Sequence, residues 1–281
     1  MAAHRRPGII CQISDWYENI EDGTLARMPS PLPSVVGAPN SFGAAQAPAQ
    51  VVASGACAFL NPRLSGTVRA PQEAFDRLRN SSGAARISPP QPIASQTWLG
   101  GSVTPAIAQE ITIGGRTIQV IRPTDAAAAG RNLPTTAQVA EALRAIPANQ
   151  LALTNLVIIS PQANPVNTPG RTIAGEGGSG EILLFPVYSP QSQNDFDNRM
   201  MHEAGHNYQE SLWRGGEDVQ EWQRAVSADS QPPSHYATEG TGEDFCEFNI
   251  IFNTARRTAC EATAREIYPN RWQKMLDYQT R

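Results

Sequence analysis

The chain has 281 residues, of which 40% are hydrophobic and 17% are charged, and its formal net charge at pH 7 is -4. A chain of this length can bury a sizeable core, as one large domain or two modest ones. A negative chain without a basic stripe has nothing to displace phosphate counterions, so we expect no nucleic-acid partner. No run of 18 apolar residues occurs, so we expect no membrane span.

The N-terminal segment "MAAHRRPGIICQISDWYENIEDG" has a short basic start but no apolar core of signal-peptide length. We therefore expect no classical signal peptide. The four cysteines, Cys11, Cys57, Cys246 and Cys260, lie far apart without a CxxC pair, which is typical of neither a disulfide scaffold nor a zinc finger. We expect buried free thiols, with a Cys11–Cys57 bridge as the alternative.

Residues 28–56 contain five prolines and no charge, which predicts an irregular, partly packed coil. A short helix is expected over 71–80, with Pro71 at its first turn and Phe75 and Leu78 on one side. The stretch "ISPPQP" (87–92) then interrupts the chain. We place a domain boundary near residue 95, with a loop-rich Pro/Ala-rich region of unknown role at 1–95 and a second domain at 96–281.

The second domain has a clearer pattern. Apolar and polar residues alternate on both sides of Gly114-Gly115 in 110–123, which predicts a tight β-hairpin. An amphipathic helix follows over 135–147, and apolar runs at 151–160 and 182–188 predict two strands separated by a glycine-rich loop. The next helix contains HEAGH, with Ser192 or Asn194 as its cap. This order predicts an α+β domain with a mixed sheet over a central helix and a helical C-terminal part.

HEAGH, residues 202–206, places two of the chain's four histidines four residues apart. On a helix, positions i and i+4 share a face, so His202 and His206 can direct two imidazole nitrogens at one zinc ion. Glu203 can lie beside the metal and act as general base toward a zinc-bound water. The alternative is an ordinary helix with two histidines, but Gly205 costs helix stability, which close packing against another backbone would explain.

A catalytic zinc ion needs a third protein ligand and an open fourth position. Downstream, Thr241 is expected to cap a helix, with Asp244 as its capping-box partner. Glu243 and Glu247 share one face of that helix, so one could bind zinc while the other accepts a hydrogen bond from a ligand histidine. A solvated surface helix is the alternative. Cys246 could also bind zinc, although a buried thiol is the commoner fate of such a cysteine.

HEAGH, followed by S-x-Y-A and then E-D-F-x-E, resembles the gluzincin metallopeptidases of the anthrax lethal factor and Pro-Pro endopeptidase type. In that group a tyrosine lies seven residues before the third zinc ligand and a second glutamate four residues after it. The resemblance covers roughly residues 100–281 and implies a zincin-like fold. It implies that His202, His206 and Glu243 bind one Zn²⁺ and that Glu203 is the general base. It also implies that Tyr236 donates to the oxyanion, with Glu247 behind the ligands.

By the same resemblance, "GEILLFP" would be the edge strand along which an extended peptide substrate adds itself. His235 is the alternative to Tyr236 as oxyanion donor, and Tyr236 could instead simply pack a loop. The glycine-rich segment 174–181 runs into a strand, which is unlike a phosphate cradle. It is either a flap beside the cleft or a plain connection.

These observations predict a zinc-dependent endopeptidase that acts, as a monomer, on an extended segment of a protein. The resemblance further implies a bacterial effector or toxin that is secreted or injected by a non-classical route; otherwise the protein would be cytoplasmic. Two alternatives remain open: a non-catalytic zincin-shaped binding or structural component, and an intracellular regulatory peptidase.

Overall fold

The computed structural model describes residues 53–63, 66–167, 173–187, 191–213, 215–229 and 231–280. These ranges belong to one compact unit that covers residues 49–281. Cys11 and almost all of the coil expected at 28–56 lie outside the described residues. The boundary expected near residue 95 falls inside the unit, within a strand of its sheet. Residues 53–95 therefore belong to the same unit as HEAGH.

The sheet has seven strands in the order β1-β3-β4-β5-β7-β6, with β2 paired to β3. Strands β4, β5 and β7 are parallel neighbours, whereas the other pairings are antiparallel, so the sheet is mixed as expected. The strands are β1 (Arg86–Ile87), β2 (Gln91–Thr97), β3 (Val103–Ile113), β4 (Arg116–Pro123), β5 (Leu156–Ile159), β6 (Gly175–Gly178) and β7 (Glu181–Leu184).

The expected hairpin is confirmed in β3 and β4, which are joined by Gly114-Gly115. Both glycines have positive φ, 56° and 81°, which is the backbone that a tight two-residue turn requires. The expected strand at 182–188 is also present as β7, but it is not the edge of the sheet. It lies between β5 and β6, so the expectation that "GEILLFP" forms the edge is wrong. The edge strand is β6, which the glycine-rich segment forms.

The helices alternate with the strands and then dominate the C-terminal part, so the fold is α+β. They are η1 (Gly55–Leu60), α2 (Gln72–Ser82), α3 (Asp125–Ala128), α4 (Thr136–Arg144), α5 (Ala148–Leu151), α6 (Gln193–Leu212), α7 (Gly216–Asp229), η2 (Tyr236–Glu239), α8 (Thr241–Ala255), α9 (Glu261–Ile267) and α10 (Pro269–Tyr278).

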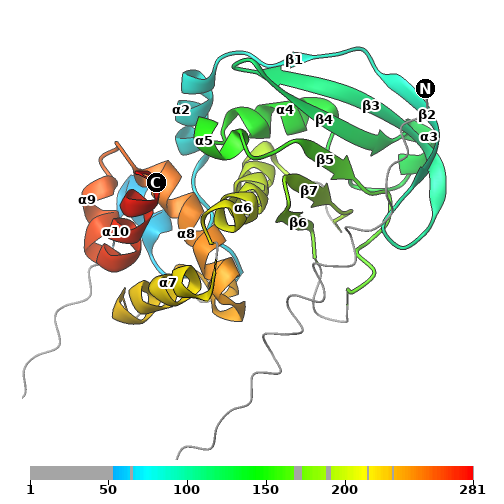
Figure 1. Ribbon diagram of the computed structural model, residues 1–281. Coiled ribbons are helices and arrows are strands. Elements are labelled where there is room, and N and C mark those ends of the chain that lie inside the picture. Colours follow the sequence, from blue (N-terminus) through cyan, green and yellow to red (C-terminus); the bar gives the residue numbers. More distant parts are fainter. Residues whose placement is uncertain are drawn as a thin grey trace, which may run out of the picture. The chain divides into compact units, whose positions relative to one another are not determined.

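Helix α6, which carries HEAGH, lies between the sheet and the C-terminal helices (Figure 1). An apolar core lies on each side of it. On one side Phe196, Met200 and Ala204 pack with α4 and the buried side chains of the sheet. On the other side Met201 and Tyr208 join a larger core formed mainly by α8, α9 and α10. Residues 53–75 contribute to this second core, which explains how the chain upstream of the sheet comes to lie behind α6.

The helix caps show where local sequence was informative. Ser192 caps α6 by accepting a hydrogen bond from the N–H of Asp195, as expected. At α8 the expected capping box is wrong, because Gly240 is the N-cap residue and no side chain caps the helix. The Asp244 carboxylate is instead held by Arg271 and by the indole N–H of Trp222. The interaction of Asp244 with the buried Arg271 guanidinium thus outweighs the local capping hydrogen bond.

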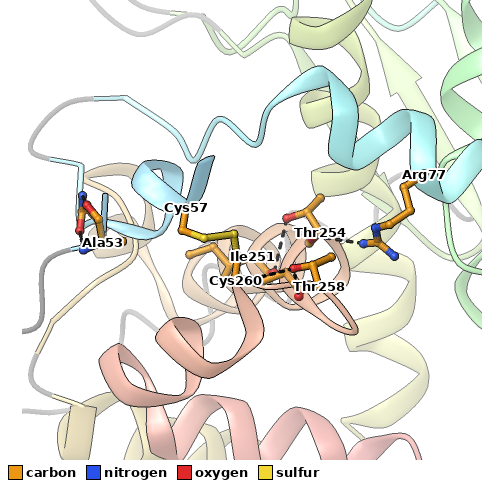
Figure 2. The surroundings of a disulfide bond; sticks show 9 residues. Ala53, Cys57, Arg77, Ile251, Thr254, Thr258 and Cys260 are labelled. Atoms are coloured by element: carbon orange, nitrogen blue, oxygen red, sulfur yellow. Dashed lines mark hydrogen bonds between the residues drawn. A yellow bond between two sulfur atoms is a disulfide. The ribbon is translucent and has the colours of Figure 1, made fainter. Parts of the chain in front are cut away.

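A disulfide joins Cys57, in η1, to Cys260, at the start of α9, across a sequence separation of 203 residues (Figure 2). The expectation of free thiols is therefore wrong for these two cysteines and confirmed for Cys246, which is buried and free. Hydrogen bonds reinforce the connection, since the Tyr268 hydroxyl donates to the Leu60 carbonyl at 2.9 Å. The bridge fixes η1 against the C-terminal helices.

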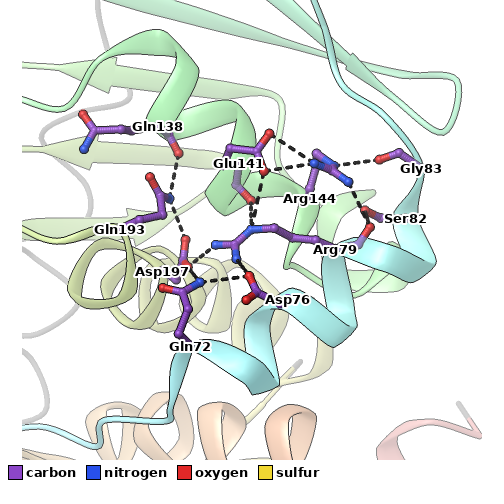
Figure 3. A network of polar contacts seen from close by, with 10 residues as sticks. All are labelled: Gln72, Asp76, Arg79, Ser82, Gly83, Gln138, Glu141, Arg144, Gln193 and Asp197. Carbon is purple, nitrogen blue, oxygen red and sulfur yellow. Dashed lines mark hydrogen bonds and ion pairs between the residues drawn. The ribbon is translucent and has the colours of Figure 1, made fainter.

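A polar network fastens α2 to α4 and α6 (Figure 3). The Arg79 guanidinium forms an ion pair with the buried carboxylate of Asp197, in α6, and donates to the Glu141 carbonyl of α4 at 3.0 Å. Asp76 accepts from the same guanidinium at 2.6 Å. This network holds the N-terminal half of the HEAGH helix in place.

Among the described residues, no helix combines the length and apolar character needed to cross a bilayer.

Candidate metal centre

The two HEAGH histidines lie side by side on α6. Their ring centroids are 5.1 Å apart, and the His202 side chain is buried whereas that of His206 is partly buried. Spacing of i and i+4 on a helix places both rings on one face. This face of α6 is turned toward α8, from which the next groups come.

Glu243, near the start of α8, approaches both histidines. Its Oε2 lies 2.9 Å from Nε2 of His202 and 3.6 Å from Nε2 of His206. Two ligand atoms on a tetrahedral zinc ion are separated by about 3.3 Å when each lies 2.0–2.1 Å from the metal. The two separations bracket that value, so the Glu243 oxygen stands to each histidine nitrogen about as a second zinc ligand would.

Cys246 lies next to the same cluster. One ligand atom each from His202, His206 and Cys246 can be chosen so that all lie within 4.8 Å of one another. Burial and the surrounding carboxylates raise the pKa of the Cys246 thiol well above its usual value. The thiol therefore favours its neutral form when no metal ion is bound.

Glu247, one turn further along α8, lies behind His202. Its Oε1 is 2.9 Å from Nδ1 of His202, and its side chain is fully buried. Its other oxygen accepts hydrogen bonds from the Ser234 hydroxyl at 2.6 Å and from the backbone N–H of Val68. A carboxylate on Nδ1 fixes the ring and leaves Nε2 directed at the metal position.

The charge balance of this cluster shifts several pKa values. Burial alone would lower the pKa of His202, but hydrogen bonds to Glu243 and Glu247 outweigh it and raise that pKa well above the usual value. Burial would raise the pKa of Glu243, yet the two histidines lower it below the usual range. In the absence of metal, a proton on His202 thus supplies positive charge to the carboxylates.

Glu203 is buried on the sheet side of α6, against the edge strand β6. A Cβ atom at Gly175 would overlap the Glu203 carboxyl group, and one at Gly177 would overlap its backbone carbonyl. Glycine is needed at both positions because strand and helix approach so closely. Burial raises the pKa of Glu203, and His202 and His206 offset this only in part. A raised pKa suits a carboxylate that must accept and then release a proton.

Tyr236 and His235, the two expected oxyanion donors, differ in position. The Tyr236 ring, in η2, lies 5.5 Å from the His202 ring between centroids, and its backbone N–H donates to the Gly66 carbonyl. His235 is exposed. The structure therefore brings Tyr236 to the histidines and leaves His235 at the surface.

Gly205 lies where α6 and α8 touch. A Cβ atom there would lie 3.1 Å from Sγ of Cys246 and 3.3 Å from its Cα. These separations are tighter than ordinary van der Waals contacts, so the helices can approach this closely because residue 205 is glycine. The expected packing against a neighbouring backbone is confirmed. It explains how Glu243 and Glu247 reach the histidines.

Three parts of this site escaped the sequence reading. The residues Ser234 and Val68, which hold Glu247, carried no recognisable motif. The glycine-rich segment, for which a flap or a plain connection is expected, forms the strand β6. Its alternating glycines signal the close approach of two backbones. Arg199, one helical turn before Glu203, was not singled out at all.

Comparison with protein families, with curated proteins and with solved structures finds no match to this chain.

Proposed function

We propose that the chain is a zinc-dependent endopeptidase that hydrolyses a peptide bond in an extended segment of a protein substrate. The observation that carries the proposal is the Glu243 oxygen lying against Nε2 of both HEAGH histidines. Glu203 is buried beside it, and Glu247 lies behind His202. This is the arrangement implied by the resemblance to gluzincins of the lethal factor and Pro-Pro endopeptidase type.

In this proposal His202, His206 and Glu243 hold the zinc ion. A zinc ion held in this way lowers the pKa of a bound water toward neutrality and polarises the substrate carbonyl. The Glu203 carboxylate takes a proton from the attacking water and passes it to the leaving amine. The Tyr236 hydroxyl, beside His202, donates to the oxygen on which negative charge develops.

The edge strand β6 supplies a place for the substrate. The Phe185 N–H donates to the Ala174 carbonyl, so Ala174 belongs to a hydrogen-bonded pair with β7. Such pairs alternate along an antiparallel ladder, so the backbone groups of Gly175 and Gly177 point away from β7. An extended peptide can pair with that open edge directly beside Glu203.

The disulfide is relevant to the compartment in which the proposed enzyme acts. Cys57–Cys260 would form and persist in an oxidising environment, which favours activity outside the cytoplasm. This supports the proposal of a secreted or injected effector or toxin over an intracellular regulatory peptidase.

The test compares wild-type protein with Glu203→Gln. Wild-type protein purified without chelator should contain about one zinc ion per chain, held by three protein ligands. It should cleave members of a peptide library. Glu203→Gln should keep the zinc and lose kcat by about 10²- to 10⁴-fold, because only the proton acceptor is removed.

Glu217→Gln, an exposed substitution on α7, is the matched control and should leave both zinc content and kcat unchanged. Undiminished cleavage by Glu203→Gln would exclude the mechanism. Wild-type protein without bound metal would favour the non-catalytic, zincin-shaped binding component instead.

A further inference from the structure

Arg199 lies on α6 four residues before Glu203, so its side chain shares the sheet-facing side of the helix with the proposed general base. Its Nη1 donates to the Ala174 carbonyl at 3.1 Å, and Ala174 immediately precedes the edge strand β6. The guanidinium also lies over the Phe196 ring, 5.1 Å from its centroid. The side chain is thus held between the helix and the start of the strand proposed to bind substrate.

Among the described residues no carboxylate lies within ion-pair distance of Arg199, and the nearby charge of Glu203 acts on it only electrostatically. No ion pair joins it to an acidic side chain there, and its buried Nε has no hydrogen-bond partner. Burial lowers the pKa of Arg199 to about 10, and the charge of Glu203 offsets this only in part.

Among the described residues the two buried arginines carry ion pairs, whereas the partly exposed Arg77, like Arg199, donates only to backbone carbonyls. Arg271 forms ion pairs with Asp229 and Asp244, and Arg79 forms ion pairs with Asp76 and Asp197. A buried cation without a partner is costly, so it is normally paired or retained for a ligand. Arg199 as a residue is partly exposed, although its Nε is buried.

We propose that Arg199 determines substrate specificity by binding the carboxylate of an aspartate or glutamate in the extended peptide. This inference rests on the proposed endopeptidase function. Four helical residues span about 6 Å along α6, which corresponds to about two residues of an extended chain. The acidic residue therefore lies within about two residues of the scissile bond. A guanidinium binds a carboxylate through two parallel N–H donors, which fixes register as well as charge.

The experiment uses pairs of peptides that carry aspartate or glutamate in one member and asparagine or glutamine in the other, at each position around the scissile bond. Wild-type enzyme should cleave the acidic member with a kcat/KM about 10- to 100-fold higher at one position, as expected for a hydrogen bond to a charged group. Arg199→Gln should abolish this preference, and Arg199→Lys should retain part of it. Arg199→Glu should prefer a basic residue at the same position, which a merely structural role would not produce.

Zinc content and melting temperature of each variant, together with the exposed control Arg224→Gln, identify any loss that comes from misfolding. Binding of the same peptides to zinc-loaded Glu203→Gln, measured by fluorescence anisotropy, separates recognition from cleavage. An acidic preference that survives in Arg199→Gln, or cleavage without any acidic preference, overturns the role of Arg199 and leaves the peptidase function standing. Wild-type enzyme that neither cleaves nor binds any peptide overturns both proposals.

Discussion

Two buried clusters of charged residues include side chains of α8, and they differ in the source of their positive charge. The arginine cluster consists of Arg271, Asp229 and Asp244. Arg271 donates to Asp244 at 2.9 and 2.7 Å and to Asp229 at 3.3 Å, while the Trp222 indole donates to Asp244. Backbone N–H groups complete the shell of Asp229. This cluster carries its own cation and leaves none of these oxygens without a partner.

The histidine cluster consists of His202, His206, Glu203, Glu243 and Glu247. It gathers three carboxylates around two imidazole rings. Within the ranges that the structure describes, no arginine or lysine forms an ion pair with any of these carboxylates. Buried carboxylates without a compensating cation are costly. We propose that the arginine cluster serves stability and that the histidine cluster, whose positive charge otherwise comes from a proton on His202, binds a metal cation.

The largest expected effect comes from opening the arginine cluster. Arg271→Met leaves Asp229 and Asp244 as buried, uncompensated carboxylates and should lower the free energy of unfolding by about 3–5 kcal/mol. Urea denaturation measures this. Lys274→Met removes a partly exposed ion pair with Glu221 and should cost about 1 kcal/mol or less. Equal losses in the two variants would contradict the structural role of the arginine cluster.

The second-largest loss in the free energy of unfolding is expected when the zinc ion proposed for the histidine cluster is removed. With free zinc at about 100 times its dissociation constant, chelation should lower the free energy of unfolding by about 2.7 kcal/mol. Because Glu243 and Asp244 are neighbours on α8, the loss in Arg271→Met compared with the loss in wild type measures the coupling between the two clusters. Thermal unfolding with and without chelator, in both proteins, provides the measurement. A chelator that leaves wild-type melting unchanged would contradict the assignment of the histidine cluster to a metal.

A smaller effect, on zinc affinity, is expected from changing a residue that holds Glu247 behind the proposed zinc ligands. Ser234→Ala removes one of two donors that hold Glu247 in place, and zinc affinity should fall by about 10- to 100-fold. Competition with a chromophoric chelator measures the affinity. Ser211→Ala is the matched control, since that hydroxyl donates to the Tyr208 carbonyl, away from the histidines. Unchanged affinity in Ser234→Ala would mean that the Val68 N–H alone holds Glu247.

The smallest effect is a pH dependence of the zinc-free protein. Because the pKa of His202 is raised in the folded state, its stabilising contribution is complete below its unfolded value and is lost as pH rises through the raised one. Chelated protein should therefore melt at a lower temperature at pH 9 than at pH 6. His235→Gln, at an exposed site, should keep this trend, whereas His202→Gln should lose it.

Much of this architecture was predictable, because the signals were local. The Gly114-Gly115 turn, the amphipathic helix expected at 135–147 and the spacing of HEAGH each depend on residues close together in sequence. The placement of Glu243 and Glu247 also followed from helical spacing and the family resemblance. Local periodicity is strong evidence for such elements.

The remaining features depend on residues that meet only in three dimensions. Cys57 and Cys260 are 203 residues apart, and no spacing rule pairs them. The strand β6 has three glycines among its four residues, so it lacks the apolar alternation that marks strands. Asp244 looked like a capping residue because the distant Arg271 could not be seen from the local sequence. Each of these errors arose where a tertiary contact outweighed a local preference.

The Cys57–Cys260 bridge also has a consequence for the timing of assembly. A ribosome adding ~5–20 residues per second needs roughly 10–40 s to travel the 203 residues between the two cysteines. Until Glu243 and Glu247 are made, late in that interval, Val68 has no Glu247 to hold and His202 has no Glu243 beside it. The centre is therefore completed only when the last fifth of the chain has been made, so a truncated nascent chain carries HEAGH without a finished site.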